Sequence, residues 1–327
     1  MKKYKWGILT AGKMSAKFVK ALKLLDNAEL YAVASRDESR AKNFALEYGF
    51  KKYYANYEEL AYDPEVEIIY IASPHSHHFE HTMLCLKNRK AVLCEKAFSL
   101  NSSEVESMIS ESRKQNVFLM EALWPPFQPI YQKTKDILNS GEAGRLVHLD
   151  ARFGFQPPYD PADRKFNLAL GGGSLLDIGI YPVHDVLYFM GVPDDVTAKA
   201  SFTPSGAEHS ISIIFGFMDG RMATVYSSFT AAAGIGCTLY CEKGNIVFSR
   251  ARDMSQRLNI SITGKDPVEY SLLPEGMGYQ FEAAEVMKCL SEGKIESEVV
   301  PHSYSLKLMK MLDKIRKEAG ITFPGRD

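Results

Sequence analysis

Short apolar runs alternate with amphipathic stretches over the first part of the chain, from Tyr4 to Ala122. The stretches between the runs carry helix signals, such as Asp37 before ESRAKNFALEY and Gly49 after it. Regular alternation of strands and helices predicts a parallel sheet with helical crossovers. The predicted strands are YKWGILT, ELYAVAS, EIIYIAS, KAVLCE and VFLMEA.

The pattern changes after Trp124, where PPFQP interrupts it. A helix is expected near residues 130–139, followed by strands with period-two alternation. In HSISIIFGF, for example, the alternate residues Ile211, Ile213 and Phe215 should share one face. GIGCTLYCEKGNIVFS predicts a hairpin, and helices are expected near 280–292 and 303–319. These elements predict an α/β protein with two domains, 1–123 with the parallel sheet and 124–327 with a largely antiparallel one.

Length and composition agree with two soluble domains. The chain has 327 residues, of which 46% are hydrophobic and 24% charged, and its formal net charge is -1. This balance gives no reason to expect nucleic acid or an acidic membrane surface as a partner. Neither a signal peptide nor a membrane span is expected, and five scattered cysteines favour a reducing cytoplasm.

The stretch GILTAGKMS stands where a dinucleotide-binding turn would follow the first strand. Of the three glycine positions in the dinucleotide fingerprint, only the second is retained, as Gly12, while Thr10 and Ser15 fill the others. The retained glycine is the one that lets phosphate approach the helix N-terminus. An ordinary strand-helix turn is the alternative interpretation.

Polar residues at the ends of the next strands extend this hypothesis. Ser35 and Arg36 follow the second strand, where a hydroxyl and a guanidinium would bind a 2′-phosphate, which favours NADP over NAD. Asp37 could contact a ribose or cap the following helix. SPHSHHFEH contains four histidines, but we expect a loop covering the cofactor rather than a metal site.

Two further stretches could carry chemistry. Lys96 ends the strand KAVLCE, where it could bind a substrate oxygen or extend into solvent. In GGGSLLDIGIYPVHD, residues Asp177, Tyr181 and His184 would share a face of a regular helix. Each also has a structural interpretation, as a capping residue, a core tyrosine or a buried histidine.

Taken together, GILTAGKMS, AVASR, IASPHSHH, CEKAFSLN, MEALW and GGGSLLDIGIYPVHD resemble the Gfo/Idh/MocA family of NAD(P)-dependent oxidoreductases, in particular its dimeric dihydrodiol and sugar dehydrogenase branch. The resemblance implies a doubly wound Rossmann domain and a substrate-binding domain whose open sheet supports a homodimer. It identifies Lys96 with the family's catalytic lysine, Asp177 with its substrate-site aspartate and Tyr181 with its histidine-or-tyrosine position. Ala97 departs from the family's Glu-Lys-Pro motif, and Pro126 stands where arginine is frequent.

The expected reaction is reversible hydride transfer between NADP(H), or NAD, and a hydroxyl-bearing carbon of a small sugar, polyol or cyclic diol. Tyr181 is the expected general acid/base, its pKa lowered by the ammonium group of Lys96, with Asp177 orienting the substrate or the lysine. Two alternatives remain open: a non-catalytic NADP-binding redox regulator, and a reductase of an unrelated carbonyl or imine substrate.

The predicted site residues fall into three groups, with no metal ligands among them. The catalytic residues are Lys96, Tyr181 and Asp177. The cofactor-binding residues are Thr10, Ala11, Gly12, Lys13, Met14, Ser35, Arg36, Ser73, Pro74, His75, His78, Glu95 and Lys96. The substrate pocket comprises Trp124, Arg164, Phe166 and His184.

Overall fold

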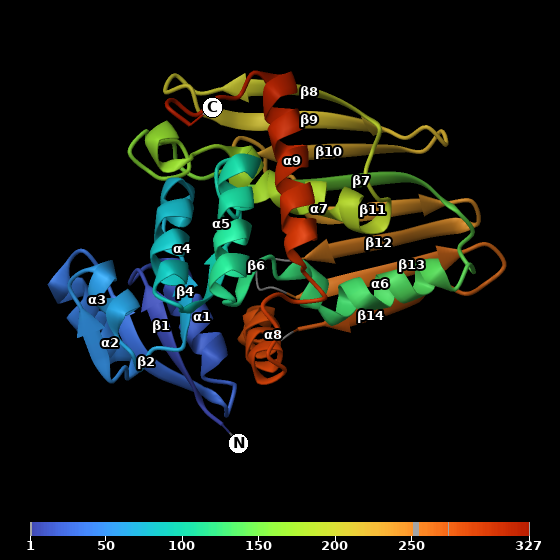
Figure 1. The fold of residues 1–327 in the computed structure, drawn as a ribbon. Helices are drawn as coiled ribbons and strands as arrows, with labels where there is room; N and C mark the ends of the chain where they lie inside the picture. Colours follow the sequence, from blue (N-terminus) through green and yellow to red (C-terminus); the bar gives the residue numbers. More distant parts are fainter. Residues whose placement is uncertain (1, 251–254, 274, 327) are drawn as a thin grey trace. The chain divides into compact units, whose positions relative to one another are not determined.

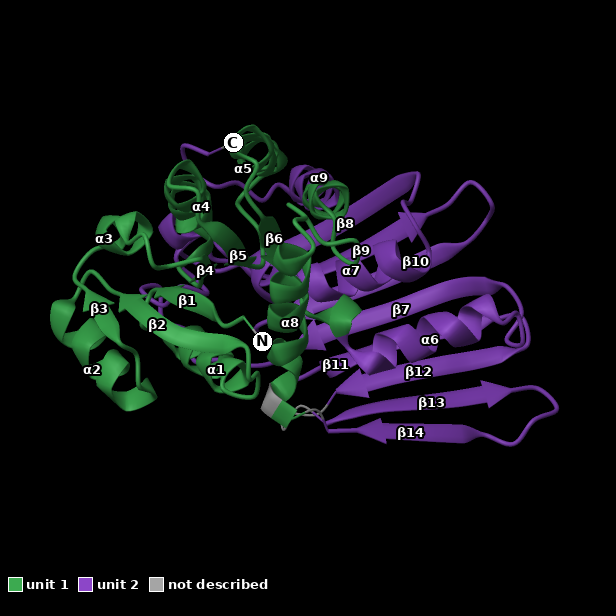
Figure 2. Ribbon diagram, turned by 60° about the horizontal axis from the view of Figure 1, so that its bottom comes forward, with its two compact units in different colours: residues 1–127, 275–309 green, residues 128–274, 310–327 purple. Residues whose placement is uncertain are grey.

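The computed structural model of the chain describes residues 2–250, 255–273 and 275–326. They form two compact units, drawn in different colours in Figure 2. Unit 1 comprises residues 1–127 and 275–309, and unit 2 comprises residues 128–274 and 310–327. Each unit is built on one sheet, of six strands in unit 1 and eight strands in unit 2.

The sheet of unit 1 is parallel and has the strand order β3-β2-β1-β4-β5-β6 (Figure 2). The order reverses between β1 and β4, and open α/β sheets bind ligands at the carboxyl ends of strands beside such a switch point. The prediction of a doubly wound parallel sheet is confirmed. Its strands are β1 (Tyr4–Leu9), β2 (Ala28–Ala34), β3 (Lys52–Tyr54), β4 (Ile68–Ile71), β5 (Ala91–Glu95) and β6 (Leu119–Ala122).

Local signals set the helix ends in unit 1. Asp37 accepts a hydrogen bond from the N–H of Arg40 at 3.0 Å, and Gly49 ends the same helix with φ of 83°. Asn101 caps another helix through the N–H of Glu104 at 2.9 Å. The helices are α1 (Lys13–Leu22), α2 (Glu38–Tyr48), α3 (Tyr57–Tyr62), α4 (His78–Lys87), α5 (Ser102–Gln115) and α8 (Tyr279–Ser291), with short 3₁₀ turns η1 (His75–His77), η2 (Pro125–Phe127) and η5 (Glu275–Gly278).

Residues 275–309 return to unit 1 after the second sheet. The N–H of Leu119 in β6 donates to the carbonyl oxygen of Ile295 at 3.0 Å. Nε2 of His302 lies 2.9 Å from the carbonyl oxygen of Leu119. These contacts fasten the returning segment to the β6 edge of the parallel sheet.

The sheet of unit 2 is largely antiparallel, as predicted, because β7 and β10 form the one parallel pair among the described strands of this sheet. Its order is β14-β13-β12-β11-β7-β10-β9-β8, and β11 and β12 form the predicted hairpin. Ile211, Ile213 and Phe215 are buried, as their alternation predicts. The strands are β7 (Leu146–Gly154), β8 (Asp195–Phe202), β9 (Glu208–Gly216), β10 (Met222–Ser228), β11 (Gly234–Cys241), β12 (Gly244–Arg250), β13 (Gln256–Ile262) and β14 (Val268–Leu272).

Helices α6 (Pro129–Asn139) and α7 (Ile180–Phe189) lie along one face of this sheet (Figure 1). Between these helices in the chain lie a 3₁₀ turn, η3 (Leu168–Leu170), and a π-helical turn, η4 (Leu175–Gly179), which runs directly into α7. The last helix, α9 (His302–Ala319), begins in unit 1 and ends in unit 2. Within the described part of the chain, no helix combines the length and apolar character that a membrane crossing requires.

Candidate active site

The turn after β1 leaves room for a phosphate at the start of α1. Gly12 is the N-cap of α1, and a Cβ atom placed on it would meet no protein atom within 4 Å. Thr10 takes φ of 95°, a conformation that glycine adopts more readily. Ser15 is buried and donates its hydroxyl to the carbonyl oxygen of Thr10 at 2.6 Å, which ties the turn together. These features fit a dinucleotide pyrophosphate at the α1 N-terminus, bordered by Ala11, Lys13 and Met14.

At the end of β2, a buried serine and an exposed arginine lie side by side. The hydroxyl of Ser35 accepts a hydrogen bond from the N–H of Asp37 at 3.2 Å, and Arg36 is exposed. Asp37 caps α2, which is one of the two roles predicted for it, the other being a contact with the ribose. The half-buried Tyr57, first residue of α3, hydrogen-bonds to the Arg36 side chain. Burial raises the pKa of the Tyr57 phenol, and Arg36 opposes that shift.

The histidine-rich loop after β4 is held by its own side chains. His78 is fully buried, with Nδ1 2.8 Å from the carbonyl oxygen of Ala97 and Nε2 2.8 Å from that of Ser73. Its ring therefore joins this loop to the segment that follows β5. Nδ1 of His81 lies 2.9 Å from the Ser73 hydroxyl oxygen, and burial lowers the pKa of His81 to about 4.

His75 is also buried, beside the ring of His78, and Pro74 precedes it at the start of η1. Among the described residues, no three or more His, Cys, Asp or Glu side chains are arranged to hold a metal ion.

Buried carboxyl groups surround the end of β5. The Tyr70 hydroxyl donates to the carboxylate of Glu95, and the N–H of Phe98 donates to Glu121 at 3.1 Å. Burial raises the pKa of Glu121 to about 7, while the positive charge of Lys96 acts in the opposite direction. Lys96 is partly exposed and joined to Ala97 by a cis peptide bond. Glu95 thus faces the interior of unit 1, whereas Lys96 reaches its surface.

In unit 1, the predicted pocket residue Trp124 is buried, with its ring 6.4 Å from that of Tyr279. The other predicted pocket residues belong to unit 2.

In unit 2, an arginine and an aspartate predicted independently form an ion pair. Nη1 and Nη2 of Arg164 lie 3.1 and 3.4 Å from the two carboxylate oxygens of Asp177. The Asp177 side chain is 10% exposed and that of Arg164 is 51% exposed. In this pair the carboxylate is therefore largely buried, whereas about half of the arginine side chain is exposed. A polar group such as a hydroxyl could hydrogen-bond to either partner.

Tyr181 follows η4 by two residues and is partly exposed. Its ring centroid lies 5.9 Å from that of Phe153 on β7. Phe166 packs in a neighbouring apolar cluster with Ile178 and Phe229. An aromatic wall therefore adjoins the phenol of Tyr181 in unit 2.

Asp177, Tyr181 and His184 would share a face only in a regular α-helix, and Asp177 instead lies in the π-helical turn η4, which precedes the α-helical part of the segment. His184 is fully buried, with ring centroids 5.9 Å from Tyr131 and 5.2 Å from Tyr188. Burial lowers the pKa of His184 to about 3, so its imidazole is neutral at physiological pH. This environment suits a core histidine, the structural alternative, better than a pocket residue.

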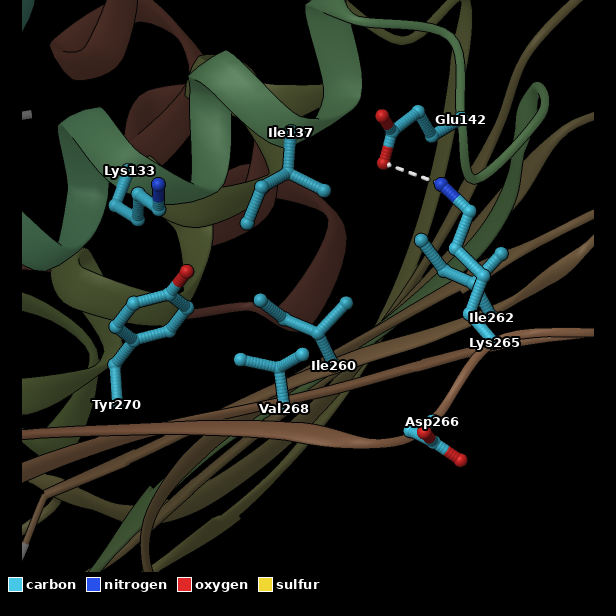
Figure 3. A pocket seen from close by; sticks show the side chains of 9 residues that line it. All are labelled: Lys133, Ile137, Glu142, Ile260, Ile262, Lys265, Asp266, Val268 and Tyr270. Carbon is cyan, nitrogen blue, oxygen red and sulfur yellow. Dashed lines mark ion pairs between the residues drawn. The ribbon is translucent and has the colours of Figure 1, made fainter.

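A separate cavity of about 180 Å³ lies under α6 at the edge of the second sheet (Figure 3). Ile137, Ile260 and Val268 contribute apolar walls, and Glu142 pairs with Lys265 at 3.0 Å across its rim. None of the predicted site residues lines this cavity. It therefore gives no support to the predicted substrate pocket.

Comparison with known proteins identifies the family. The model of the oxidoreductase family with an NAD-binding Rossmann fold matches residues 4–123, and that of the GFO/IDH/MocA C-terminal domain matches residues 131–247. A trans-1,2-dihydrobenzene-1,2-diol dehydrogenase from Xenopus tropicalis is 35% identical over 334 residues, which cover 98% of this chain and 99% of the relative. The chain belongs to the Gfo/Idh/MocA family of oxidoreductases. This Gfo/Idh/MocA protein is accordingly an NAD(P)-dependent enzyme, as its sequence motifs predict.

Solved structures share the fold of this Gfo/Idh/MocA protein. A 3-ketoreductase from Actinomadura kijaniata, in complex with NADP and TDP-benzene, superposes with a TM-score of 0.87 at 21% identity, covering 97% of this chain and 98% of the other. An aldose-aldose oxidoreductase from Caulobacter crescentus, complexed with glycerol, has a TM-score of 0.87 at 23% identity, with 98% of both chains covered. At these identities the likeness concerns the fold.

Two functional candidates escaped the sequence analysis. Tyr57 contacts Arg36 although the two residues belong to different helical crossovers of unit 1. Glu208, at the start of β9, lies against the glycine-rich turn before η4. No local motif marks either residue, because both contacts depend on chain segments that meet only on folding.

Proposed function

We propose that this enzyme transfers a hydride between NADP(H) and the hydroxyl- or carbonyl-bearing carbon of a cyclic diol, small sugar or polyol. The observation that carries the proposal is the near full-length similarity, at 35% identity, to a trans-1,2-dihydrobenzene-1,2-diol dehydrogenase. The Arg164–Asp177 pair supports it, because a guanidinium and a carboxylate at one place suit a substrate with neighbouring hydroxyl groups.

The proposed roles follow the chemistry of an alcohol oxidised to a carbonyl. When bound, a nicotinamide cofactor supplies the hydride acceptor, or the hydride donor in the reverse direction. Tyr181 removes the hydroxyl proton as the C–H bond breaks, and returns it on reduction. Lys96 is the second proposed catalytic residue, as the family motif implies, and Asp177, held by Arg164, orients the substrate hydroxyls.

The residues proposed to hold the cofactor belong to unit 1. Gly12 and the start of α1 would take the pyrophosphate, Ser35 and Arg36 a 2′-phosphate, and the loop from Ser73 to His78 would cover the dinucleotide. Exposed Arg36 beside buried Ser35, with Asp37 engaged as a helix cap, supports NADP over NAD. Arg36→Ala should therefore weaken NADPH binding much more than NADH binding, as measured by fluorescence titration of each cofactor. Equal losses would count against a 2′-phosphate contact.

Changing Tyr181 to phenylalanine tests the catalytic proposal. The variant should lose turnover by roughly two to four orders of magnitude, the usual contribution of general acid/base catalysis, and bind NADPH nearly as the wild type does. Tyr62→Phe, at an exposed aromatic residue of α3 in unit 1, serves as the matched control and should keep its turnover. Screening should pair NADP⁺ reduction by sugars and diols with NADPH oxidation by the matching carbonyls. Unchanged turnover of Tyr181→Phe would remove Tyr181 from the mechanism.

Two other functions would give different results in the same screen. A reductase of an unrelated carbonyl or imine substrate would oxidise NADPH with such compounds and reject every diol. A non-catalytic redox regulator would bind NADPH without turnover and would not need Lys96, Asp177 and Tyr181 together, so their joint presence argues against it.

A homodimer through the open face of the eight-stranded sheet is a further part of the proposal. Ile214, Met222 and Tyr240 lie on this face and are 46%, 48% and 46% exposed. Met222→Arg should shift the mass measured by light scattering from dimer to monomer, whereas Met218→Arg, in the β9–β10 turn, should leave it unchanged. A monomeric wild type would refute the dimer.

The cytoplasm is the proposed location, because all five cysteines are free thiols.

A further inference from the structure

A buried glutamate lies beneath the segment that carries Asp177 and Tyr181. Glu208, the first residue of β9, is 1% exposed. One of its carboxyl oxygens accepts a hydrogen bond from the backbone N–H of Leu175, the first residue of η4. Ser174, directly before it, also hydrogen-bonds to the Glu208 side chain. Glu208 thus caps the turn from inside the unit.

The same carboxyl group packs against the glycine-rich turn. A Cβ atom on Gly173 would overlap an oxygen of Glu208, and Gly173 has φ of 141°, where side chains are strained. The N–H of Gly173 donates to the carbonyl oxygen of Lys165 at 2.9 Å, and Lys165 directly follows Arg164. Glu208 therefore contacts Gly173, the residue through which the segment carrying Asp177 is hydrogen-bonded to the loop carrying Arg164.

We infer that Glu208 is a positioning residue for substrate binding, which sets the geometry of the Arg164–Asp177 pair and of the following Tyr181 through the turn at residues 173–175. This inference rests on the proposed function, in which those three residues contact the substrate. Glu208 itself is enclosed by the turn and offers a ligand almost no exposed surface. Its action on substrate is consequently indirect.

The chemistry of the carboxyl group indicates which variant preserves its role. Burial raises the pKa of Glu208 to about 8, and the Leu175 N–H, the Ser174 side chain and the charge of Arg316 oppose this shift. The group is therefore largely protonated at pH 7, and glutamine reproduces its shape and its acceptor oxygen. Alanine removes the acceptor and leaves a cavity beside Gly173.

Steady-state kinetics of Glu208→Ala and Glu208→Gln at pH 7 test the inference, with Glu269→Gln on the exposed strand β14 as control. The alanine variant should raise KM for the diol or sugar and lower kcat/KM by roughly tenfold or more, because small displacements of positioning groups are costly. Its NADPH dissociation constant should stay within about twofold of wild type. The glutamine variant should restore kcat/KM.

Hydrogen exchange of the peptide covering residues 173–181 supplies a readout that needs no substrate. Glu208→Ala should accelerate exchange there, and Glu208→Gln and Glu269→Gln should not. Accelerated exchange with wild-type KM and kcat/KM would overturn the positioning role. Unchanged exchange in the folded alanine variant would also overturn it. Failure of the proposed function is recognised separately, by Tyr181→Phe retaining full turnover.

Discussion

Replacing Gly12 with alanine should separate cofactor binding from folding. Its φ of -113° and ψ of 179° are accessible to alanine, and the added Cβ meets no protein atom within 4 Å. Loss of a glycine N-cap costs up to about 1 kcal/mol, and the smaller entropy of the unfolded chain returns about 0.4–1 kcal/mol. The two effects oppose each other, so the free energy of unfolding should change by no more than about 1 kcal/mol in either direction.

The effect on the cofactor should be larger, because the new methyl group projects where phosphate approaches the start of α1. An anion gains about 0.3–2 kcal/mol from a helix N-terminus, so a pyrophosphate held away from it should bind roughly 2- to 30-fold more weakly. Calorimetric titration with NADPH and thermal unfolding without cofactor measure the two effects. Gly49→Ala is the matched control, since φ of 83° at the end of α2 strains alanine. It should lower the Tm and keep the NADPH affinity. Wild-type NADPH affinity in Gly12→Ala would refute the phosphate site.

Three further changes test other parts of the structure. Tyr57→Phe should weaken NADPH more than NADH, though less than Arg36→Ala does, because only the support of the guanidinium is lost; equal effects of Tyr57→Phe on both cofactors would contradict this. Asp185→Asn should lose less stability than wild type as pH rises from about 4 to 7, measured by Tm. Burial raises the pKa of Asp185 to about 7, so the folded state holds a proton that the unfolded state releases, and an unchanged pH slope would show otherwise. Phe18→Ala should destabilise unit 1 by about 3–5 kcal/mol in urea, since this ring is fully buried and stacks on Tyr70 at 3.7 Å; a loss below 1 kcal/mol would contradict that packing.

The structure confirms the predictions of helix ends and strand faces that rest on residues close together in the sequence. Asp37 and Gly49 delimit α2, and alternating residues such as Ile211 and Ile213 identify a buried strand face. A helix cap depends on nearby backbone groups, and a hydrophobic period depends on the spacing of nearby residues. Both can therefore be recognised from the sequence without knowledge of the fold. Strand β3 was not predicted because its residues are mostly exposed and lack a buried period.

The same distinction applies to the site residues. The chain alone shows which side chains are available, from Gly12 and Arg36 to Asp177 and Tyr181, and which family they indicate. Their surroundings depend on the fold: Arg164 pairs with Asp177, His184 is enclosed by aromatic rings, and Glu208 supports the turn from another strand. These contacts join segments that are separated in the chain, and the π-helical turn η4 interrupts the regular helical period that would put Asp177 and Tyr181 on one face.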